Sequence, residues 1–181
     1  MKDVKQTSRA NKYATRATVA VAMVLATSVG ALAWSDEITN DRDYNTVCEY
    51  APGAQCAGAI RMDADLSGVD MEGASMTTMR LDHSNLSRAN LERAILHMTN
   101  LEGANLTFAN LTGAHMHAVN LQGADLMMAN LTGVNLLDAD LRGANLLGAK
   151  MTDVILFEAK LDNAIWPDGH VCGEGSIGEC R

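Results

Sequence analysis

Residues 104–113 read ANLTFANLTG, two copies of the five-residue unit Ala-(Asn/Asp)-Leu-x-x that decides the fold. From Leu66 to Leu161 every fifth residue is Leu or Met, at 20 positions without a break. Two residues before these positions stands Ala in 13 cases and Val in four, and the exceptions are Met79, Ser84 and Thr99. A period of five is therefore the dominant feature of the sequence.

This period excludes a regular helix and a flat strand. Five residues advance a helix by about 500°, so successive Leu would step around the cylinder instead of forming one stripe. In a flat strand an odd period alternates between the two faces. A chain that bends once per unit satisfies the pattern, because Ala and Leu then face inward and the residue between them faces outward.

The two remaining residues of each unit are expected to form a corner. Gly occupies the second corner position in eight units, where a turn can require a positive φ angle: Gly68, Gly73, Gly103, Gly113, Gly123, Gly133, Gly143 and Gly148. The outward position is usually Asn or Asp, and departures from this rule include Arg80, Ile95, His115, Lys150, Ile155 and Lys160. The expected product is a narrow coil with Leu stacked on Leu.

The repeat resembles the pentapeptide repeat family over residues 64–163. The resemblance implies an all-β fold, a right-handed quadrilateral β-helix with four units per coil. Twenty units would give about five coils and, at the spacing of neighbouring strands, a rod about 24 Å long. We expect the core ladder to include Leu66, Leu86, Leu91, Leu106, Leu111, Leu126, Leu131 and Leu146.

The regions outside the repeat suggest three further segments. Residues 1–33 have the basic start, the apolar stretch and the small residues Ala31 and Ala33 of a secretory signal peptide. The alternative is an uncleaved membrane anchor, for which the stretch is short and rich in Ala. Residues 34–63 are expected to form an N-terminal lead and cap. Residues 164–181 resemble the closing segment of exported family members, with Trp166 as a lid over the last coil.

The expected charge and location of the mature protein depend on cleavage of the signal peptide. The whole chain has a net charge of −8, and removal of residues 1–33 leaves 9 basic against 21 acidic residues, a net charge of −12. Such a chain repels nucleic acid and anionic lipid, so we expect no nucleic-acid partner and no membrane association after cleavage. The expected location is periplasmic or secreted.

The four cysteines form two pairs with eight-residue spacing, Cys48 with Cys56 and Cys172 with Cys180. An even count in an exported protein favours disulfides, and a zinc site is the alternative, although neither pair has C-x-x-C spacing. In the rod implied by the resemblance, the pairing Cys48–Cys56 and Cys172–Cys180 is favoured. The other connectivities would join opposite ends, unless the N-terminal lead folds back along the rod.

Two surface clusters are candidate sites on what we define as the third side, the one whose outward residues are Ser75, Ile95, His115, Asn135 and Ile155. His97, His115 and His117 are close enough in this arrangement to bind zinc or copper, or they are simply solvated. Ile95, Leu137, Ile155 and Phe157 form a candidate interaction surface. A competing apolar patch on the first side contains Phe108, Met127, Met128 and Leu147.

No catalytic or cofactor motif is present in the sequence, so we expect a non-enzymatic protein without a cofactor. The favoured function is an exported structural scaffold that presents flat β-helix faces to an unidentified protein partner or to a second copy in a homodimer. The first alternative is a metal-binding module built on the histidine cluster. The second alternative follows from the resemblance, since some cytoplasmic family members mimic duplex DNA and bind DNA gyrase. That function would require the chain to stay in the cytosol.

Overall fold

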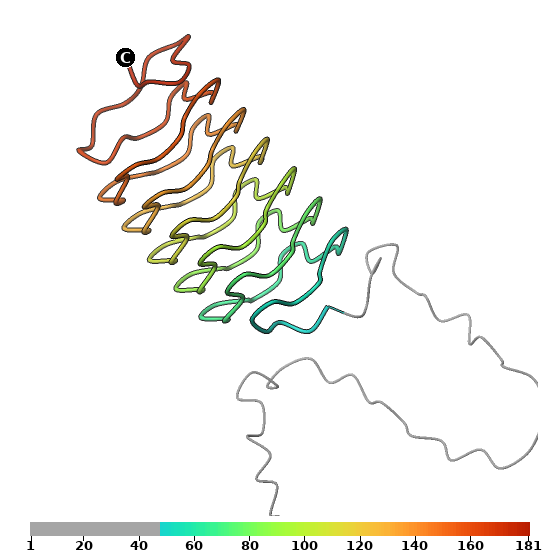
Figure 1. Cartoon of the computed structure of the whole chain (residues 1–181). Coiled ribbons are helices and arrows are strands. Elements are labelled where there is room, and N and C mark those ends of the chain that lie inside the picture. The colour runs from blue at the N-terminus through green and yellow to red at the C-terminus, as the bar shows by residue number, and fades with distance from the viewer. Residues whose placement is uncertain (1–47) are drawn as a thin grey trace, which may run out of the picture. The chain divides into compact units, whose positions relative to one another are not determined.

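The computed structural model describes residues 48–181, so the expected signal peptide and residues 34–47 of the lead lie outside the described part. From residue 55 onward the chain winds in coils of 20 residues (Figure 1). Each outward residue forms a parallel β-bridge with the residue 20 positions later, from Gln55↔Ser75 to Asn145↔Ile165. These are isolated bridges connected by turns rather than continuous strands. The described residues contain no helix that is long and apolar enough to span a membrane.

Four columns of bridges run along the rod and define its four sides. The first side carries Asn105, Asp125 and Asn145, and the second carries Asn110, Asn130 and Lys150. The third side carries Ile95, His115, Asn135 and Ile155, and the fourth carries Asn100, Asn120, Asp140 and Lys160. The register of 20 residues therefore places residues with the same position in successive coils directly beside each other.

The core consists of the two inward residues of every unit. Among the eight Leu of the expected core ladder, Leu66 retains 8% exposure and the other seven are fully buried. The inward hydroxyls are also buried and are paired: Ser84 Oγ donates to the carbonyl of Leu81 (2.6 Å), and Thr99 Oγ1 donates to that of Met76 (2.7 Å). Hydrogen bonding removes most of the penalty of burying a hydroxyl.

The corners are turns with a positive φ at the second corner residue. In the unit that begins at Leu131, the amide of Val134 donates to the carbonyl of Leu131 (3.1 Å), and Gly133 has a φ of 68°. This is the pattern of a type II turn. In the described part of the chain, thirteen non-glycine residues also have a positive φ at this position, among them Phe108 and Met128. The fold therefore imposes the left-handed conformation at this position whether or not the residue is Gly.

The outward Asn and Asp residues form hydrogen-bond ladders along the sides. Asn110 Oδ1 accepts from the amide of Thr112 (3.2 Å), while its Nδ2 donates to Asn90 Oδ1 (3.2 Å) in the preceding coil. Asn145 Nδ2 donates to Asp125 Oδ1 in the same way (3.1 Å). The side-chain oxygen thus supports the following corner, and the side-chain amide links neighbouring coils. This explains why the outward position prefers Asn and Asp.

The N-terminal end of the ladder differs from the boundary expected at residue 64. The first bridge lies at Gln55, and Cys56 fills an inward position with its side chain fully buried. Arg61, which interrupts the sequence pattern, occupies the equivalent inward position five residues later. It is tolerated because it is only half-buried and its Nη1 donates to the carbonyl of Ile60 (2.8 Å). An inward slot in the first coil therefore accepts a side chain that the middle coils would exclude.

At the C-terminal end the chain folds back over part of the last coil (Figure 1). Antiparallel bridges join Ile165 to Val171 and Lys160 to Ile177. The amide of Asn163 donates to the carbonyl of Cys172 (2.9 Å), and that of Leu161 to Ser176 (2.9 Å). Residues 171–177 therefore cover the first and fourth sides of the last coil. They belong to the segment 164–181, which is called the C-terminal cap below.

Candidate functional site

The apolar residues of the third side gather near its C-terminal end. Ile155 and Phe157 are 52% and 66% exposed, and Leu137 lies half-buried one coil before Phe157. The bridge Asn135↔Ile155 and the hydrogen bond from the amide of Asp138 to the carbonyl of Phe157 (3.0 Å) hold these two coils in register. Ile95 is exposed as well but stands three coils away, about 14 Å along the rod. Three of the four expected interaction residues therefore form one cluster.

The second and third sides of the last coil form an open edge that the sequence did not reveal. Within residues 48–181 the backbone amides of Met151, Asp153 and Leu156 have no hydrogen-bond acceptor, because the cap does not extend over them. The side chains of Met151, Val154 and Leu156 are only partly buried against the core. Unpaired edge groups beside apolar side chains favour the addition of another chain segment. A hint in the sequence is that no complete unit with Leu or Met follows the one that contains Leu161.

These residues together make up what we call the terminal patch: Leu137, Val154, Ile155, Leu156 and Phe157. The patch combines exposed apolar side chains on the third side with the open edge that adjoins them. Within the described residues no ring or cationic group contacts Phe157. Phe157 is therefore not covered by a ring or cation of residues 48–181, although Gly178 of the cap lies near the carbonyl of Leu156, where an added Cβ atom would be 3.5 Å away.

The competing patch on the first side is more occupied by its own chain. Phe108 is 52% exposed, but the Arg88 guanidinium lies over its ring, 5.8 Å from the centroid. Met128 lies over Gly148, where a Cβ atom would be 2.5 Å from the Met128 sulfur. Leu147 is exposed and Met127 is half-buried. The first-side residues thus already make side-chain contacts of the kind that Phe157 lacks.

The histidine cluster is close but not convergent. The ring of His97 lies 6.2 Å from that of His115 and 5.9 Å from that of His117, in tilted and edge-on orientations. His117 Nε2 is paired with Asp138 Oδ2 at 3.1 Å. His97 Nδ1 is the only buried side-chain nitrogen or oxygen in the described part of the chain without a hydrogen-bond partner. The three rings are neighbours, yet their ligand atoms do not form a compact group.

The cysteines form two disulfides, Cys48–Cys56 and Cys172–Cys180. In the C-terminal pair Cys172 is fully buried, whereas Cys180 is half-exposed. Trp166 is half-buried against the core of the last coil, and its ring lies 6.5 Å from that of His170. The expected lid residue therefore packs on the last coil and lies beside His170.

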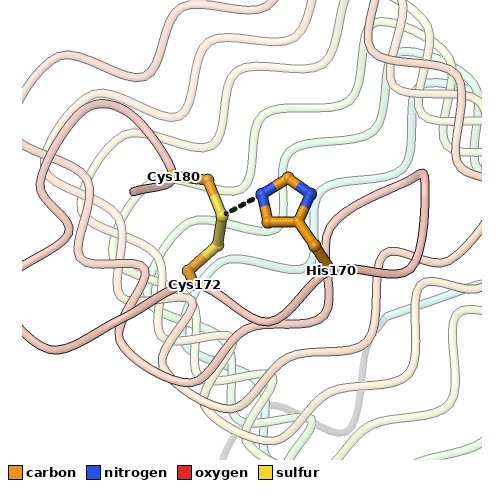
Figure 2. A group of neighbouring side chains, drawn as sticks. All are labelled: His170, Cys172 and Cys180. Carbon is orange, nitrogen blue, oxygen red and sulfur yellow. Dashed lines mark hydrogen bonds between the residues drawn. A yellow bond between two sulfur atoms is a disulfide. The ribbon is translucent and has the colours of Figure 1, made fainter.

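An imidazole points at the C-terminal disulfide. His170 Nε2 lies 3.0 Å from Cys180 Sγ, as Figure 2 shows. On its other side His170 Nδ1 pairs with Asp168 Oδ1 at 2.5 Å. Hydrogen bonds from the backbone amide and the ring of His170 hold the pKa of Asp168 below its ordinary value. The sequence analysis missed this arrangement, for which the run Asp168-Gly169-His170-Val171-Cys172 was the available signal.

The fourth side is polar and largely self-paired. Arg142 forms an ion pair with Asp140 (2.6 Å), and Arg80 forms one with Asp82 (3.1 Å). Partial burial alone would raise the pKa of Asp140, but hydrogen bonds and charge from Arg142, with Lys160 nearby, keep that pKa below its ordinary value. On the first side, hydrogen bonds from Ser67 likewise lower the pKa of Asp65. These carboxylates therefore support the surface structure.

The repeat region of the chain matches a known protein family. The family model described as pentapeptide repeats matches eight copies over residues 62–97, 99–136, 120–156 and 135–165. No curated protein matches the chain.

Several solved structures are similar. The pentapeptide repeat protein Rfr23 from the cyanobacterium Cyanothece 51142 is 38% identical with a TM-score of 0.50, and the match covers 51% of this chain and 63% of that one. HetL from Nostoc sp. strain PCC 7120, involved in heterocyst differentiation regulation, is 30% identical with a TM-score of 0.37 and coverage of 66% and 70%. QnrB1, a plasmid-mediated fluoroquinolone resistance protein, is 18% identical with a TM-score of 0.48 and coverage of 69% and 62%.

The chain thus spans 63% of the length of Rfr23. The family matches imply a right-handed quadrilateral β-helix, in agreement with the 20-residue register of the bridges. The chain belongs to the pentapeptide repeat family.

Proposed function

We propose that this protein is a non-enzymatic, exported scaffold of about five coils that binds a protein partner through the terminal patch. The observation that carries the proposal is the exposure of Phe157, which is 66% exposed and has no ring or cation partner among residues 48–181. Leu136, an inward residue one coil earlier, is fully buried. A contiguous apolar surface on a small protein usually marks a contact site. The open edge beside it offers backbone donors to an extended segment of the partner.

The other sides are less suited to this role. The fourth side presents ion pairs whose charges would have to be desolvated in a contact. The apolar residues of the first side are partly covered by Arg88 and by the neighbouring corners. Contact at the terminal patch would remove exposed apolar side chains from water without breaking the ion pairs of the fourth side.

Export is supported by the two disulfides, which form and persist in oxidising compartments. The basic and apolar start of the sequence supports it too, since it fits a signal peptide. N-terminal sequencing of the cell-derived protein tests this part of the proposal. A periplasmic product that begins at Trp34 is expected, whereas a cytosolic product that keeps residues 1–33 would favour the DNA-mimic alternative.

The interface is tested with a pair of matched double variants. Leu137→Asp with Phe157→Asp places two carboxylates in the terminal patch, and Met127→Asp with Met128→Asp places two on the first side. We expect both proteins to fold, as judged by circular dichroism. Only the first should lose self-association in ultracentrifugation or the partners that the wild type retains from periplasmic extract. Loss in the Met127 and Met128 variant alone would move the interface to the first side.

Metal binding by the histidine cluster is the second candidate function. The unpaired, buried Nδ1 of His97 favours it, because a buried nitrogen without a partner could accept a metal ion or a proton. Titration of the oxidised protein with Zn²⁺ or Cu²⁺ tests it against the variant with His97, His115 and His117 all changed to Ala. Equal metal uptake by the two proteins would eliminate this function.

A further inference from the structure

The C-terminal cap contains a compact group of metal-ligating atoms. His170 Nε2, Cys172 Sγ and Cys180 Sγ all lie within 4.8 Å of one another, and no other group of three potential ligands of this kind exists among residues 48–181. Figure 2 shows the imidazole directed at Cys180 Sγ, with Cys172 Sγ bonded to it. We propose that reduction of the Cys172–Cys180 disulfide converts this group into a Zn²⁺ site with two thiolate ligands and one imidazole ligand.

The ligand types fit zinc. Thiolate and imidazole are the two ligands that Zn²⁺ uses most in proteins, and a tetrahedral site with bonds of about 2.0–2.3 Å places its ligand atoms about 3.5–3.8 Å apart. The present separations are compatible with that spacing once the two sulfurs are no longer bonded to each other. His170 is exposed, so water can take the fourth position.

The histidine is already oriented as a metal ligand. Asp168 Oδ1 pairs with His170 Nδ1, which leaves Nε2 free to face Cys180. Metal-binding histidines usually hold a carboxylate or carbonyl on the second ring nitrogen in this way. The backbone of His170 is fixed as well, because its carbonyl accepts from the amide of Trp166 (2.8 Å). Asp168 is thus a positioning residue for the proposed site.

The cap can open by the required amount without losing its attachment. Cys172 is held in the last coil, where its amide donates to the carbonyl of Ala164 and its carbonyl accepts from Asn163 (2.9 Å each). Cys180 is half-exposed, and Gly175 and Gly178 in the intervening loop have φ angles of 77° and 70°. Small rotations in this loop can separate the sulfurs while Cys172 stays in place.

The disulfide is converted into the zinc site in two steps, reduction and metal binding. A dithiol reductant breaks the S–S bond, delivers two electrons and two protons to the sulfurs, and becomes a disulfide itself. Zn²⁺ then displaces both thiol protons to solvent as the thiolates bind it. Metal is the favoured partner after reduction because the fully buried Cys172 sulfur has no water to stabilise it as a free thiolate. The site is therefore closed to zinc in the oxidised protein and available in the reduced one.

The N-terminal disulfide supplies a control. No imidazole or carboxylate completes a three-ligand group with Cys48 and Cys56 in the described part of the chain. Two full-length variants separate the pairs: Cys48→Ser with Cys56→Ser keeps the C-terminal pair, and Cys172→Ser with Cys180→Ser keeps the N-terminal pair. Each is reduced with a phosphine, which does not compete for zinc as thiols do, and circular dichroism verifies that the coils persist.

Equilibrium dialysis against Zn²⁺ then measures uptake, and Co²⁺ substitution reports thiolate ligation through its sulfur charge-transfer absorption. The variant that keeps the C-terminal pair should take up one additional equivalent when reduced, relative to its oxidised form. The variant that keeps the N-terminal pair should show no gain. His170→Ala, at an exposed position, should weaken the reduced site at least tenfold, and Asp168→Asn about tenfold.

Three results would overturn the proposal: equal gains in the two double variants, zinc affinity unchanged by His170→Ala, or uptake that appears only when the coils have unfolded. Binding by the histidine cluster does not interfere, because it would be the same in the oxidised and the reduced protein.

Discussion

The middle of the rod and its C-terminal end contain the same five-residue unit in different surroundings. Leu131, Val134 and Leu136 are fully buried, and the amides of Leu131 and Leu136 donate to the next coil (2.8 Å each). One coil later, Met151 and Leu156 are only half-buried, and within residues 48–181 their amides have no acceptor. The unit therefore does not by itself create a buried core, since each coil becomes interior only when the next one covers it.

This difference predicts unequal costs for the same substitution. Leu111→Asp places a carboxylate among fully buried side chains, so we expect it to destabilise the protein by at least about 3 kcal/mol. Leu156→Asp places the same group at the open end, where water can reach it, and should cost about 1 kcal/mol. Thermal unfolding followed by circular dichroism measures both. Equal losses would contradict the assignment of the last coil as an open end.

The disulfide of the cap should stabilise the end of the rod more than the middle. Cys172–Cys180 closes a nine-residue loop, worth about 2.5 kcal/mol in the chain-entropy model. Its removal by Cys172→Ser with Cys180→Ser should release the cap and expose the first and fourth sides of the last coil. Limited proteolysis is expected to cut within residues 164–181 first. Simultaneous cleavage throughout the coils would mean that the cap and the middle of the rod unfold as one unit.

Substitutions in the outward hydrogen-bond ladders should have smaller effects on stability than those in the core. The outward Asn110 is hydrogen-bonded along the side, since its Nδ2 donates to Asn90 Oδ1 (3.2 Å) and to Glu92 Oε2 (3.4 Å). Asn110→Asp removes this donor and places a carboxylate beside Glu92, at an expected cost of about 1 kcal/mol. Asp125→Asn keeps the oxygen that accepts from Asn145, so it should be nearly silent in the same denaturant titration.

The smallest expected effect is on the stability of the protein at acid pH. Because Arg142 and Lys160 lower the pKa of Asp140 in the folded protein, the stability from this carboxylate is complete above the unfolded pKa of about 3.9. It disappears as the pH falls through the lower pKa of the folded state. Arg142→Gln should therefore reduce the loss of thermal stability between pH 5 and acid conditions relative to wild type. An identical pH profile for the two proteins would mean that the pair contributes nothing.

Much of the fold was predictable because the repeat acts on every coil in the same way. The inward Leu positions follow directly from the period of five, and the family resemblance adds the four-sided geometry. The start of the ladder at Gln55 was not predictable, since Arg61 interrupts the pattern at a place where a half-buried slot tolerates it.

The candidate sites were harder to predict than the coils. Register places His97 beside His117 and Leu137 beside Phe157, and both neighbourhoods are visible in the sequence. The open edge at Met151 and Leu156 depends on which sides the cap covers, and that is decided by the antiparallel pairing of residues 171–177. The orientation of His170 toward Cys180 depends on the same pairing. Tertiary pairing without a repeat leaves no periodic signal in the sequence.

Hydrogen exchange of individual backbone amides tests the open end most directly. In the free, monomeric protein the amides of Met151 and Leu156 should exchange rapidly, while those of Leu131 and Leu136 should be strongly protected by their bonds to the next coil. When the terminal patch is occupied by a partner or a second copy, Met151 and Leu156 should become protected and Leu131 should not change. Strong protection of Met151 and Leu156 in the monomer, or no gain of protection in the complex, would contradict the account.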